Sequence, residues 1–531
     1  MLYFIPAWYQ NGKWEENEQS WYTRRMHTEF DDTVKQIQLF HRSKVHPYQI
    51  LLLSYAPNFR HFLHRQGVYH APYWSCFDAI QGIRRKKAMV LSFHNLKWPE
   101  GIEFVYSNFV LLAMLEGRLY AQVEFGEDGN LIRIDLYRDG MLWRKNIYDD
   151  RGFVSATIRY EEGRKICQDY LGEDGVWRIR EYAGDGHVEV NPRSPEYLLV
   201  RDGQEIWCHF AAERYDSLQD VLEEVLKAYL EQTEENAVFC MAMHEQHIPL
   251  LQEALQKHRK ILSFYENRLS GEKLSDMVSF LQTADYIVVD SEENLHRVLD
   301  STEHMLTRIR EISPYDSRID HGISTQLNVQ KILVPVDGIE DEVLEELMRR
   351  LGEYLLQNEN ARVHWFTRRA DYDMESRLLQ HTGQVLRQAG FPENWAAGRP
   401  DKTVAENDLE EEKTGCARFY VEQCVDELSV SKCIREQRIL VDLRREREIY
   451  LQIAAVSVGI PQIVRKGTKY VEHGKNGFLL QNLAELPRCL EYYLDGMKHW
   501  NEAHIYSREL GEQNSTSVLI EEWKEVIEQI G

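Results

Sequence analysis

The chain has 531 residues and a formal net charge of −23. That length exceeds what one hydrophobic core organises, so we expect two or three domains. The negative charge argues against a general nucleic-acid-binding protein, because such a protein needs a basic surface to displace counterions from phosphates. No apolar run reaches the roughly 18 residues of a membrane-spanning helix, so we expect any membrane contact to be peripheral.

Residues 1–115 mix strand and helix patterns, which we interpret as the first part of a Rossmann-like domain. The apolar opening at 3–9 lacks a basic region and predicts a buried strand rather than a signal peptide. Residues 30–40 repeat apolar side chains at helical spacing. The continuous apolar run at 49–55 is typical of a strand buried on both faces of a parallel sheet.

The next section has a regular series of glycine turns. Consecutive turn glycines are separated by 11 or 12 residues, with β-branched and aromatic segments between them. Short strands joined by such turns indicate an antiparallel meander. We predict an antiparallel β-sheet domain over 116–210, inserted into the first Rossmann-like domain, and expect that it can be deleted while the flanking blocks stay folded. The turn glycines are Gly129, Gly140, Gly152, Gly163, Gly175 and Gly186.

The α/β pattern returns after residue 210. Ser217 is placed to cap a helix whose apolar residues recur at i, i+3, i+4 and i+7 as far as Leu230. Residues 211–325 would complete the first Rossmann-like domain. Residues 326–531 would form a second one, with a C-terminal helix at 517–530. Two doubly wound blocks are expected to hold ligands at the carboxyl ends of their strands or between the blocks.

The most informative pattern lies near the C-terminus. Glu446 precedes an apolar helix, Gly459 and Pro461 form a Gly-x-Pro turn, and a Gly-Lys-Asn-Gly turn follows at 474–477. This order resembles the nucleotide-sugar half of a GT-B glycosyltransferase. Retaining members of that fold carry a glutamate at each of two positions, which correspond here to Glu446 and Ala454. The resemblance therefore implies that one residue needed for the chemistry is missing.

A second part of the donor site is also missing. The GT-B fold usually neutralises the leaving diphosphate with an Arg just after the first strand of the C-terminal domain and a Lys a few residues later. Residues 334–342 contain neither, and four of these nine residues are acidic, so a bound diphosphate would be repelled. We predict no catalytic residue, no cofactor and no metal site. The vestigial donor-site or cleft positions would be Glu446, Ala454, Gly459, Pro461, His321 and Gly322.

Several of these positions also have a plainer interpretation. Glu446 lies in an Arg-rich run, where a helix-start glutamate paired with neighbouring arginines fits as well as a surviving sugar contact. His321 and Gly322 fall where the chain passes between the two blocks, and a linker glycine with polar neighbours explains them without a cleft role. The dense N-terminal aromatics fit either sugar stacking or core packing. The candidates for glycan contact are Trp8, Tyr9, Trp14 and Trp21.

Over essentially its whole length the chain resembles the accessory Sec system proteins of Gram-positive cocci, specifically the GT-B-like member of the three-protein accessory secretory set. The resemblance is carried by residues 3–9, 313–318 and 331–338 and by the inserted meander. It implies a cytoplasmic protein, with peripheral contact at the inner face of the cell membrane as an option. The implied partners are two companion accessory secretory proteins, the accessory Sec translocase ATPase and a glycosylated serine-rich repeat adhesin.

These observations favour a non-catalytic, glycosyltransferase-like scaffold that binds partner proteins and the glycosylated adhesin and supports its modification and export. The exposed edge or face of the meander is a ready docking site for such a partner. Two alternatives stay open. One is an active retaining glycosyltransferase that uses UDP-GlcNAc on the adhesin, and the other is a carbohydrate-binding module without a role in transport.

Overall fold

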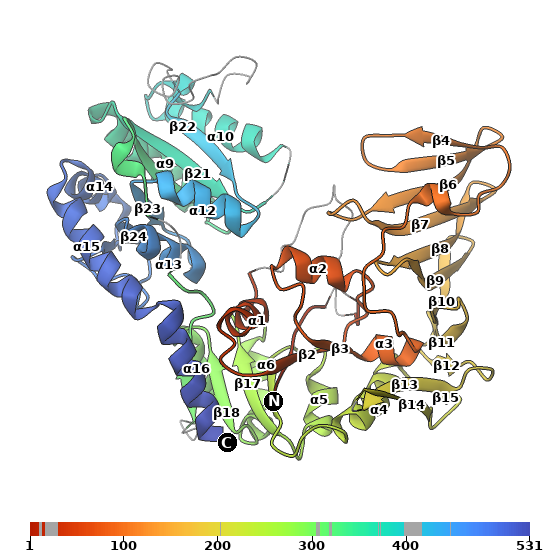
Figure 1. Cartoon of the computed structure of the whole chain (residues 1–531). Coiled ribbons are helices and arrows are strands. Elements are labelled where there is room, and N and C mark those ends of the chain that lie inside the picture. Colours follow the sequence, from red (N-terminus) through yellow and green to blue (C-terminus); the bar gives the residue numbers. More distant parts are fainter. Residues whose placement is uncertain are drawn as a thin grey trace. The chain divides into compact units, whose positions relative to one another are not determined.

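The computed structural model describes residues 1–9, 13–15, 30–201, 203–303, 308–317, 321–369, 371, 373–397, 417–446 and 448–530. Contacts within the chain divide it into two compact units (Figure 1). The first consists of Met1–Ile312 with Lys524–Gly531, and the second of Ser313–Trp523. Among the described residues, no helix is long and apolar enough to cross a membrane.

The first unit contains a seven-stranded sheet in which all neighbouring strands are parallel. Its order, β19-β18-β17-β16-β1-β2-β3, runs outward from β1 in both directions, which is the predicted doubly wound arrangement. The first strand ends at Ile5, before Pro6, because proline cannot donate to a sheet ladder. The strands are β1 (Leu2–Ile5), β2 (Tyr48–Leu52), β3 (Tyr73–Ser75), β16 (Val238–Ala242), β17 (Arg259–Phe264), β18 (Tyr286–Val289) and β19 (Ile309–Glu311).

Helix α4 (Leu218–Leu230) forms as its sequence pattern predicts. The Ser217 side chain accepts from the Asp220 N–H, and the Asp220 carboxylate accepts from the Ser217 N–H, so this capping box satisfies first-turn donors. Its apolar stripe is buried in the core of the first unit. The other helices of this unit are α1 (Asp32–Ser43), α2 (Phe59–Arg65), α3 (Cys76–Gln81), α5 (Ile248–Ala254), α6 (Gly271–Asp276), α7 (Val278–Leu281), α8 (Glu292–Ser301) and the 3₁₀ helix η1 (Phe93–Asn95).

The inserted section is a ten-stranded antiparallel sheet with a separate hairpin, β13–β14. All six turn glycines have positive φ, from +75° at Gly129 to +86° at Gly152, so the turns form where predicted. The strands extend beyond 116–210, because two strands before residue 116 and one after residue 210 join the sheet. The strands are β4 (Ile102–Tyr106), β5 (Leu111–Leu115), β6 (Arg118–Phe125), β7 (Leu131–Arg138), β8 (Met141–Asp149), β9 (Phe153–Glu161), β10 (Arg164–Leu171), β11 (Trp177–Tyr182), β12 (Val188–Val190), β13 (Glu196–Arg201), β14 (Gln204–His209) and β15 (Arg214–Tyr215).

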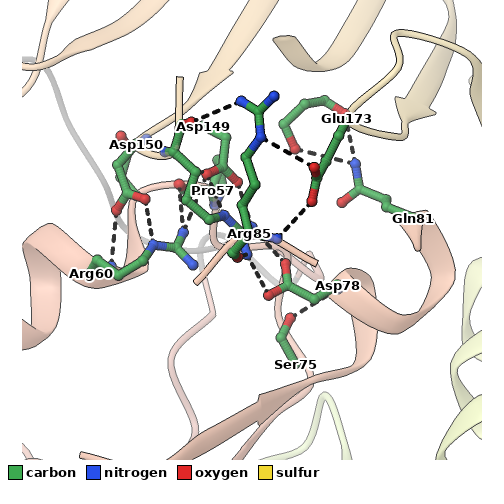
Figure 2. A network of polar contacts seen from close by, with 12 residues as sticks. Pro57, Arg60, Ser75, Asp78, Gln81, Arg85, Asp149, Asp150 and Glu173 are labelled. Atoms are coloured by element: carbon green, nitrogen blue, oxygen red, sulfur yellow. Dashed lines mark hydrogen bonds and ion pairs between the residues drawn. The ribbon is translucent and has the colours of Figure 1, made fainter. Parts of the chain in front are cut away.

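The inserted sheet shares its core with the Rossmann-like part of the first unit, which corrects the expectation that it can be removed. Tyr170 of β10 is fully buried, and its ring centroid lies 5.2 Å from those of both Tyr55 and Phe77. Buried charges also join the two parts, because Arg60 of α2 pairs with Asp150 in the turn after β8 (Figure 2). One hydrophobic cluster contains residues from both parts, so deleting the sheet would expose it.

The second unit contains a six-stranded parallel sheet in the order β22-β21-β20-β23-β24-β25. The strands are β20 (Gln330–Pro335), β21 (Ala361–Thr367), β22 (Phe419–Gln423), β23 (Ile439–Asp442), β24 (Gln462–Val464) and β25 (Gly477–Leu479). The helices are η2 (Ser324–Gln326), α9 (Asp341–Gln357), α10 (Met374–Gln388), η3 (Glu393–Ala396), α12 (Glu427–Glu436), α13 (Ile449–Val458), η4 (Leu483–Glu485), α14 (Leu486–Leu494) and α15 (Lys498–Gln513). Helix α16 (Thr516–Ile530) begins in the second unit, and its residues from Lys524 onward belong to the first. Two doubly wound sheets and an antiparallel insertion are thus confirmed. The four domain boundaries stay a prediction.

A buried histidine makes the stability of the first unit dependent on pH. His247 Nδ1 lies 2.9 Å from the Tyr9 hydroxyl and Nε2 lies 2.5 Å from the Ala242 carbonyl oxygen. Burial lowers the pKa of His247 to about 3. In the unfolded chain this histidine has a pKa of about 6.5, so below that pH it binds a proton that it does not bind in the folded chain. The free energy of unfolding therefore falls as the pH drops from about 6.5 towards 3.

We expect the free energy of unfolding to fall by about 2 kcal/mol from pH 7 to pH 5 because of His247 alone. Urea denaturation at several pH values measures this loss. His247→Gln keeps a hydrogen-bonding side chain without the titration, so it should flatten the pH dependence. An unchanged slope in the variant would show that His247 is not the group responsible.

Candidate functional site

The candidate site is the carboxyl edge of the second unit's sheet. The strand order reverses between β20 and β23, and doubly wound folds bind nucleotides outside such a reversal. Glu446 lies in the loop between β23 and α13 and is exposed. Ala454 lies within α13, and only 1% of it is exposed. The two predicted glutamate positions thus fall on the loop and on the helix that follow β23.

Gly459 ends α13 and is required there by its backbone and by its neighbour. Its φ is +80°, and a Cβ atom would lie 2.2 Å from His504 Nδ1. The same His504 nitrogen is 2.8 Å from the Gly459 carbonyl oxygen. Pro461 follows, and its carbonyl accepts from the Leu440 N–H at 3.1 Å, which joins the turn to β23. The Gly-x-Pro turn therefore joins α13 to the sheet.

We expect Gly459→Ala to lower the free energy of unfolding by about 2–3 kcal/mol. An alanine is strained at this left-handed backbone conformation, and its Cβ atom would push His504 away from its hydrogen bond. Gly474→Ala is a matched control, since its φ is +79° but nothing lies within 4 Å of the added Cβ. It should lose only about 1 kcal/mol. Chemical denaturation of both variants separates the backbone strain from the contact with His504. An equal loss of stability in the two variants would rule out that contact as a cause.

His321 and Gly322 contact helices of the second unit. An Arg508 guanidinium nitrogen lies 3.0 Å from His321 Nδ1, and Arg435 Nε donates to the His321 carbonyl at 3.3 Å. A Cβ on Gly322 would lie 3.1 Å from the Val458 carbonyl oxygen, so the chain packs closely there. These contacts support the plainer interpretation, in which the glycine is kept for packing. A cleft role for either residue stays a prediction.

The N-terminal aromatics are packed inside the first unit. Trp8 is 5% exposed, its Nε1–H donates to Asp31 at 3.0 Å, and its ring centroid lies 4.7 Å from that of Phe62. Tyr9 and Trp14 are also buried, with ring centroids 5.4 Å apart. Little of these three rings is open to a sugar, which supports the core-packing interpretation. Trp21 lies outside the described residues.

The sequence pattern noted the Arg-rich run around Glu446 but did not group it with other arginines at the carboxyl edge. The loop after β20 carries no cation, whereas the loops after β21, β23 and β24 each carry arginines. This grouping was missed because each arginine lies far along the chain from residues 334–342, and only the parallel sheet brings these loops to one edge. These arginines are Arg368, Arg369, Arg444, Arg445 and Arg465.

Carboxylates of the same unit neutralise these arginines. Glu448 pairs with Arg368 and lies 3.4 Å from Arg444. Glu340 bridges two more, with its oxygens 2.9 Å from Arg445 and 3.0 Å from Arg465. Two guanidinium groups around one anionic group is also how proteins hold a phosphate. At this edge the anionic groups belong to the chain itself.

Two further carboxylates also hold edge arginines, one of which, Arg444, is shared with Glu448. Asp442 accepts from Arg444 Nη2 at 2.7 Å. Asp337 accepts from the Thr367 hydroxyl and from the Arg368 N–H, both at 2.7 Å, and lies 3.5 Å from Arg369 Nε. The acidic loop after β20 thus binds the basic loop after β21. A ligand diphosphate at this edge would have to displace these internal contacts.

A pocket of about 350 Å³ lies beside this edge, between α9 and the loops after β23, β24 and β25. Leu443, Leu480 and Leu483 give it an apolar part, and Arg350 and Arg465 give it charge. None of the vestigial donor-site positions lines it. The pocket and the predicted donor positions are therefore made by different residues of the same edge.

Residues 1–530 match the model of a protein family described as the first protein, accessory secretory protein 1, of the accessory Sec system. The chain belongs to this family. A family member from Streptococcus gordonii is 31% identical over 535 residues, covering 100% of this chain and 99% of that protein. One solved structure is described as accessory secretory protein 1, 2 and 3 of Streptococcus pneumoniae. It has a TM-score of 0.82 and 28% identity, covering 100% of this chain and 99% of that one.

Solved glycosyltransferases show the same architecture at much lower identity. The pneumococcal O-GlcNAc transferase GtfA, solved in complex with UDP and GlcNAc, has a TM-score of 0.69 and 11% identity, covering 100% of this chain and 98% of that one. This likeness shows the fold, which is GT-B-like as the C-terminal pattern predicted. A member of the accessory secretory protein 1 family therefore has a glycosyltransferase-like fold.

Proposed function

We propose that this chain is a non-catalytic GT-B-like component of the accessory Sec system. It binds partner proteins and the glycosylated serine-rich repeat adhesin and supports the modification and export of that adhesin. The observation that carries the proposal is the carboxyl edge, where Glu448 and Glu340 already occupy the arginines that a diphosphate would need. Ala454 in the second glutamate position supports the same conclusion.

The partners follow from the family. The pneumococcal relative was solved as accessory secretory proteins 1, 2 and 3, and a second relative as the Gap123 complex of Streptococcus agalactiae. We therefore propose two companion accessory secretory proteins as direct partners. The translocase ATPase and the adhesin are the further partners that the accessory Sec role implies. The protein would act in the cytoplasm, with peripheral contact at the inner face of the cell membrane as an option.

Two measurements test the proposal. Co-expression with the two companions and purification by a tag on this chain should recover all three proteins together. Isothermal titration with UDP-GlcNAc should show weak binding or none, with no release of UDP. Recovery of this chain alone would contradict the partner role, and turnover of UDP-GlcNAc would contradict the non-catalytic role.

The second candidate is an active retaining glycosyltransferase that uses UDP-GlcNAc on the adhesin. The edge arginines favour it, because they supply cations that the loop after β20 lacks. Glu446 is exposed and would then be the remaining member of the glutamate pair. In that case turnover of UDP-GlcNAc would be detectable and Glu446→Ala would abolish it. The scaffold proposal expects Glu446→Ala to leave complex formation unchanged.

A further inference from the structure

An exposed basic segment at residues 84–90, here called the basic strap, follows α3 and runs beside the inserted sheet. Its sequence is Arg-Arg-Lys-Lys-Ala-Met-Val, and every one of its residues is exposed, Val90 by 97%. Four consecutive cations are unusual in a chain with a net charge of −23.

The backbone of the basic strap is anchored at both ends. The N–H groups of Arg84 and Arg85 donate to one Glu173 oxygen at 2.5 and 2.7 Å, and the Met89 N–H donates to the Asp150 carbonyl at 2.7 Å. Figure 2 shows Arg85 reaching the Glu173 carboxylate. A segment fixed at both ends loses little conformational entropy when a partner binds to it.

Strand β14 lies beside the basic strap and has an open edge. The Arg201↔Gln204 pair closes the hairpin, and the Phe210 N–H donates to the Pro195 carbonyl at 3.0 Å. The alternation of an antiparallel ladder therefore points the N–H groups of Glu205, Trp207 and His209 away from β13. Within the described residues, no further strand pairs with β14. An open edge of this kind accepts an added strand.

Direct contacts connect the basic strap to the face of β14 that Glu205 and Trp207 share, next to this edge. The Arg84 guanidinium lies 2.8 Å from the Glu205 carboxylate and 5.5 Å from the centroid of the Trp207 ring. Arg85 pairs with Glu173 at 3.2 Å. In the described part of the chain, Lys86 and Lys87 have no carboxylate within ion-pair distance. These two lysines are therefore the cations available to a partner.

We propose that the β14 edge and the basic strap together bind an extended acidic segment of a partner polypeptide. The segment adds to β14 as a strand and places carboxylates against Lys86 and Lys87. This proposal rests on the proposed function in one respect: the proposed function requires a protein partner, and the β14 edge with the basic strap is a surface on which such a partner docks. Hydrogen bonds to the edge give affinity, and the two lysines give the preference for acidic sequences.

A membrane surface fits these observations less well. Arg84 and Arg85 are paired within the chain, and two remaining lysines contribute only about 1 kcal/mol each at an anionic surface. That attraction would act against the negative charge of the whole protein. A lipid headgroup also makes no use of the row of outward N–H groups on β14, whereas a peptide backbone does.

The test uses fluorescence anisotropy of the full-length protein with a labelled short peptide in which Asp and Val alternate. A peptide alternating Ser and Val and vesicles containing phosphatidylglycerol are compared with it. We expect the acidic peptide to bind in preference to both. The double variant Lys86→Gln/Lys87→Gln should weaken that binding at least about tenfold. His209→Pro, which removes one outward N–H, should weaken it by a similar factor.

Matched controls separate these effects from general changes. Lys257→Gln/Lys432→Gln alters the net charge equally at exposed sites elsewhere, and His209→Ala keeps the N–H, so both should bind like the wild type. Equal binding of the strap variant and the wild type would overturn the proposal, as would vesicle binding without peptide binding. If the companions still co-purify while the peptide fails to bind, this inference fails and the proposed function stands.

Discussion

Arg151→Met is expected to lower the free energy of unfolding by about 3–5 kcal/mol, because it removes both guanidinium hydrogen bonds to the buried Asp149 carboxylate and leaves that carboxylate with Arg60 at 3.5 Å. The Arg151 guanidinium makes two bidentate contacts. It donates to both Asp149 oxygens at 2.7 Å and to the Asp78 oxygens at 2.7 and 2.8 Å. Asp149 is almost fully buried, so water replaces its lost partner poorly, whereas the Asp78 side chain is 24% exposed and water can reach it.

The position of Arg151 makes this effect larger than the loss of one ion pair. Asp78 belongs to α3 of the Rossmann-like part, whereas Asp149 ends β8 of the inserted sheet. Arg60 continues the network from α2 to Asp150 (Figure 2). Removing Arg151 therefore loosens the junction through which the sheet and the parallel strands share one core.

Urea denaturation of Arg151→Met and Arg159→Met provides the comparison. Arg159 also pairs with a buried carboxylate, Asp169, at 2.7 Å, but its side chain is 53% exposed and Arg180 contacts the same carboxylate. The control should therefore lose less than about 1 kcal/mol. Similar losses in the two variants would mean that the junction network adds nothing beyond an ordinary ion pair.

The sequence was a good guide wherever one short stretch decides the structure. The capping box and apolar stripe of α4 need only the residues from Ser217 to Leu230, and the helix forms as predicted. The glycine turns of the meander also form, because each needs only a residue that tolerates positive φ. The turn at Gly459 was also predicted from a short stretch, because a glycine with positive φ ends α13 just before β24.

Features that depend on distant residues were missed. Strands β4 and β5 were also left out of the predicted sheet, although their pairing is local: β5 joins β6 through the tight turn at Glu116 and Gly117, which was not counted in the series of glycine turns. The shared core around Tyr170 joins residues far apart in the chain. The grouping of the edge arginines was missed for the same reason, since Arg368 and Arg465 meet the acidic loop after β20 only through the sheet.

Glu448→Gln is expected to raise the affinity for UDP, and Glu340→Gln/Glu448→Gln to raise it by about tenfold or more over the wild type. Glu448 contacts Arg368 and Arg444, and Glu340 contacts Arg445 and Arg465. Neutral glutamines hold these guanidinium groups less strongly, so the arginines become available to a diphosphate. Glu448 is the more buried of the two, and so its substitution alone should already show the gain.

Isothermal titration with UDP and with pyrophosphate measures this gain. The control Glu502→Gln/Glu509→Gln removes the same charge from exposed positions of α15. It should leave the affinity unchanged, because in the described part of the chain neither residue pairs with an edge arginine or lines the pocket beside the edge. No gain in a folded Glu340→Gln/Glu448→Gln variant would mean that the internal carboxylates do not block the edge. Ala454 and the acidic loop after β20 would then have to account for any lack of nucleotide binding.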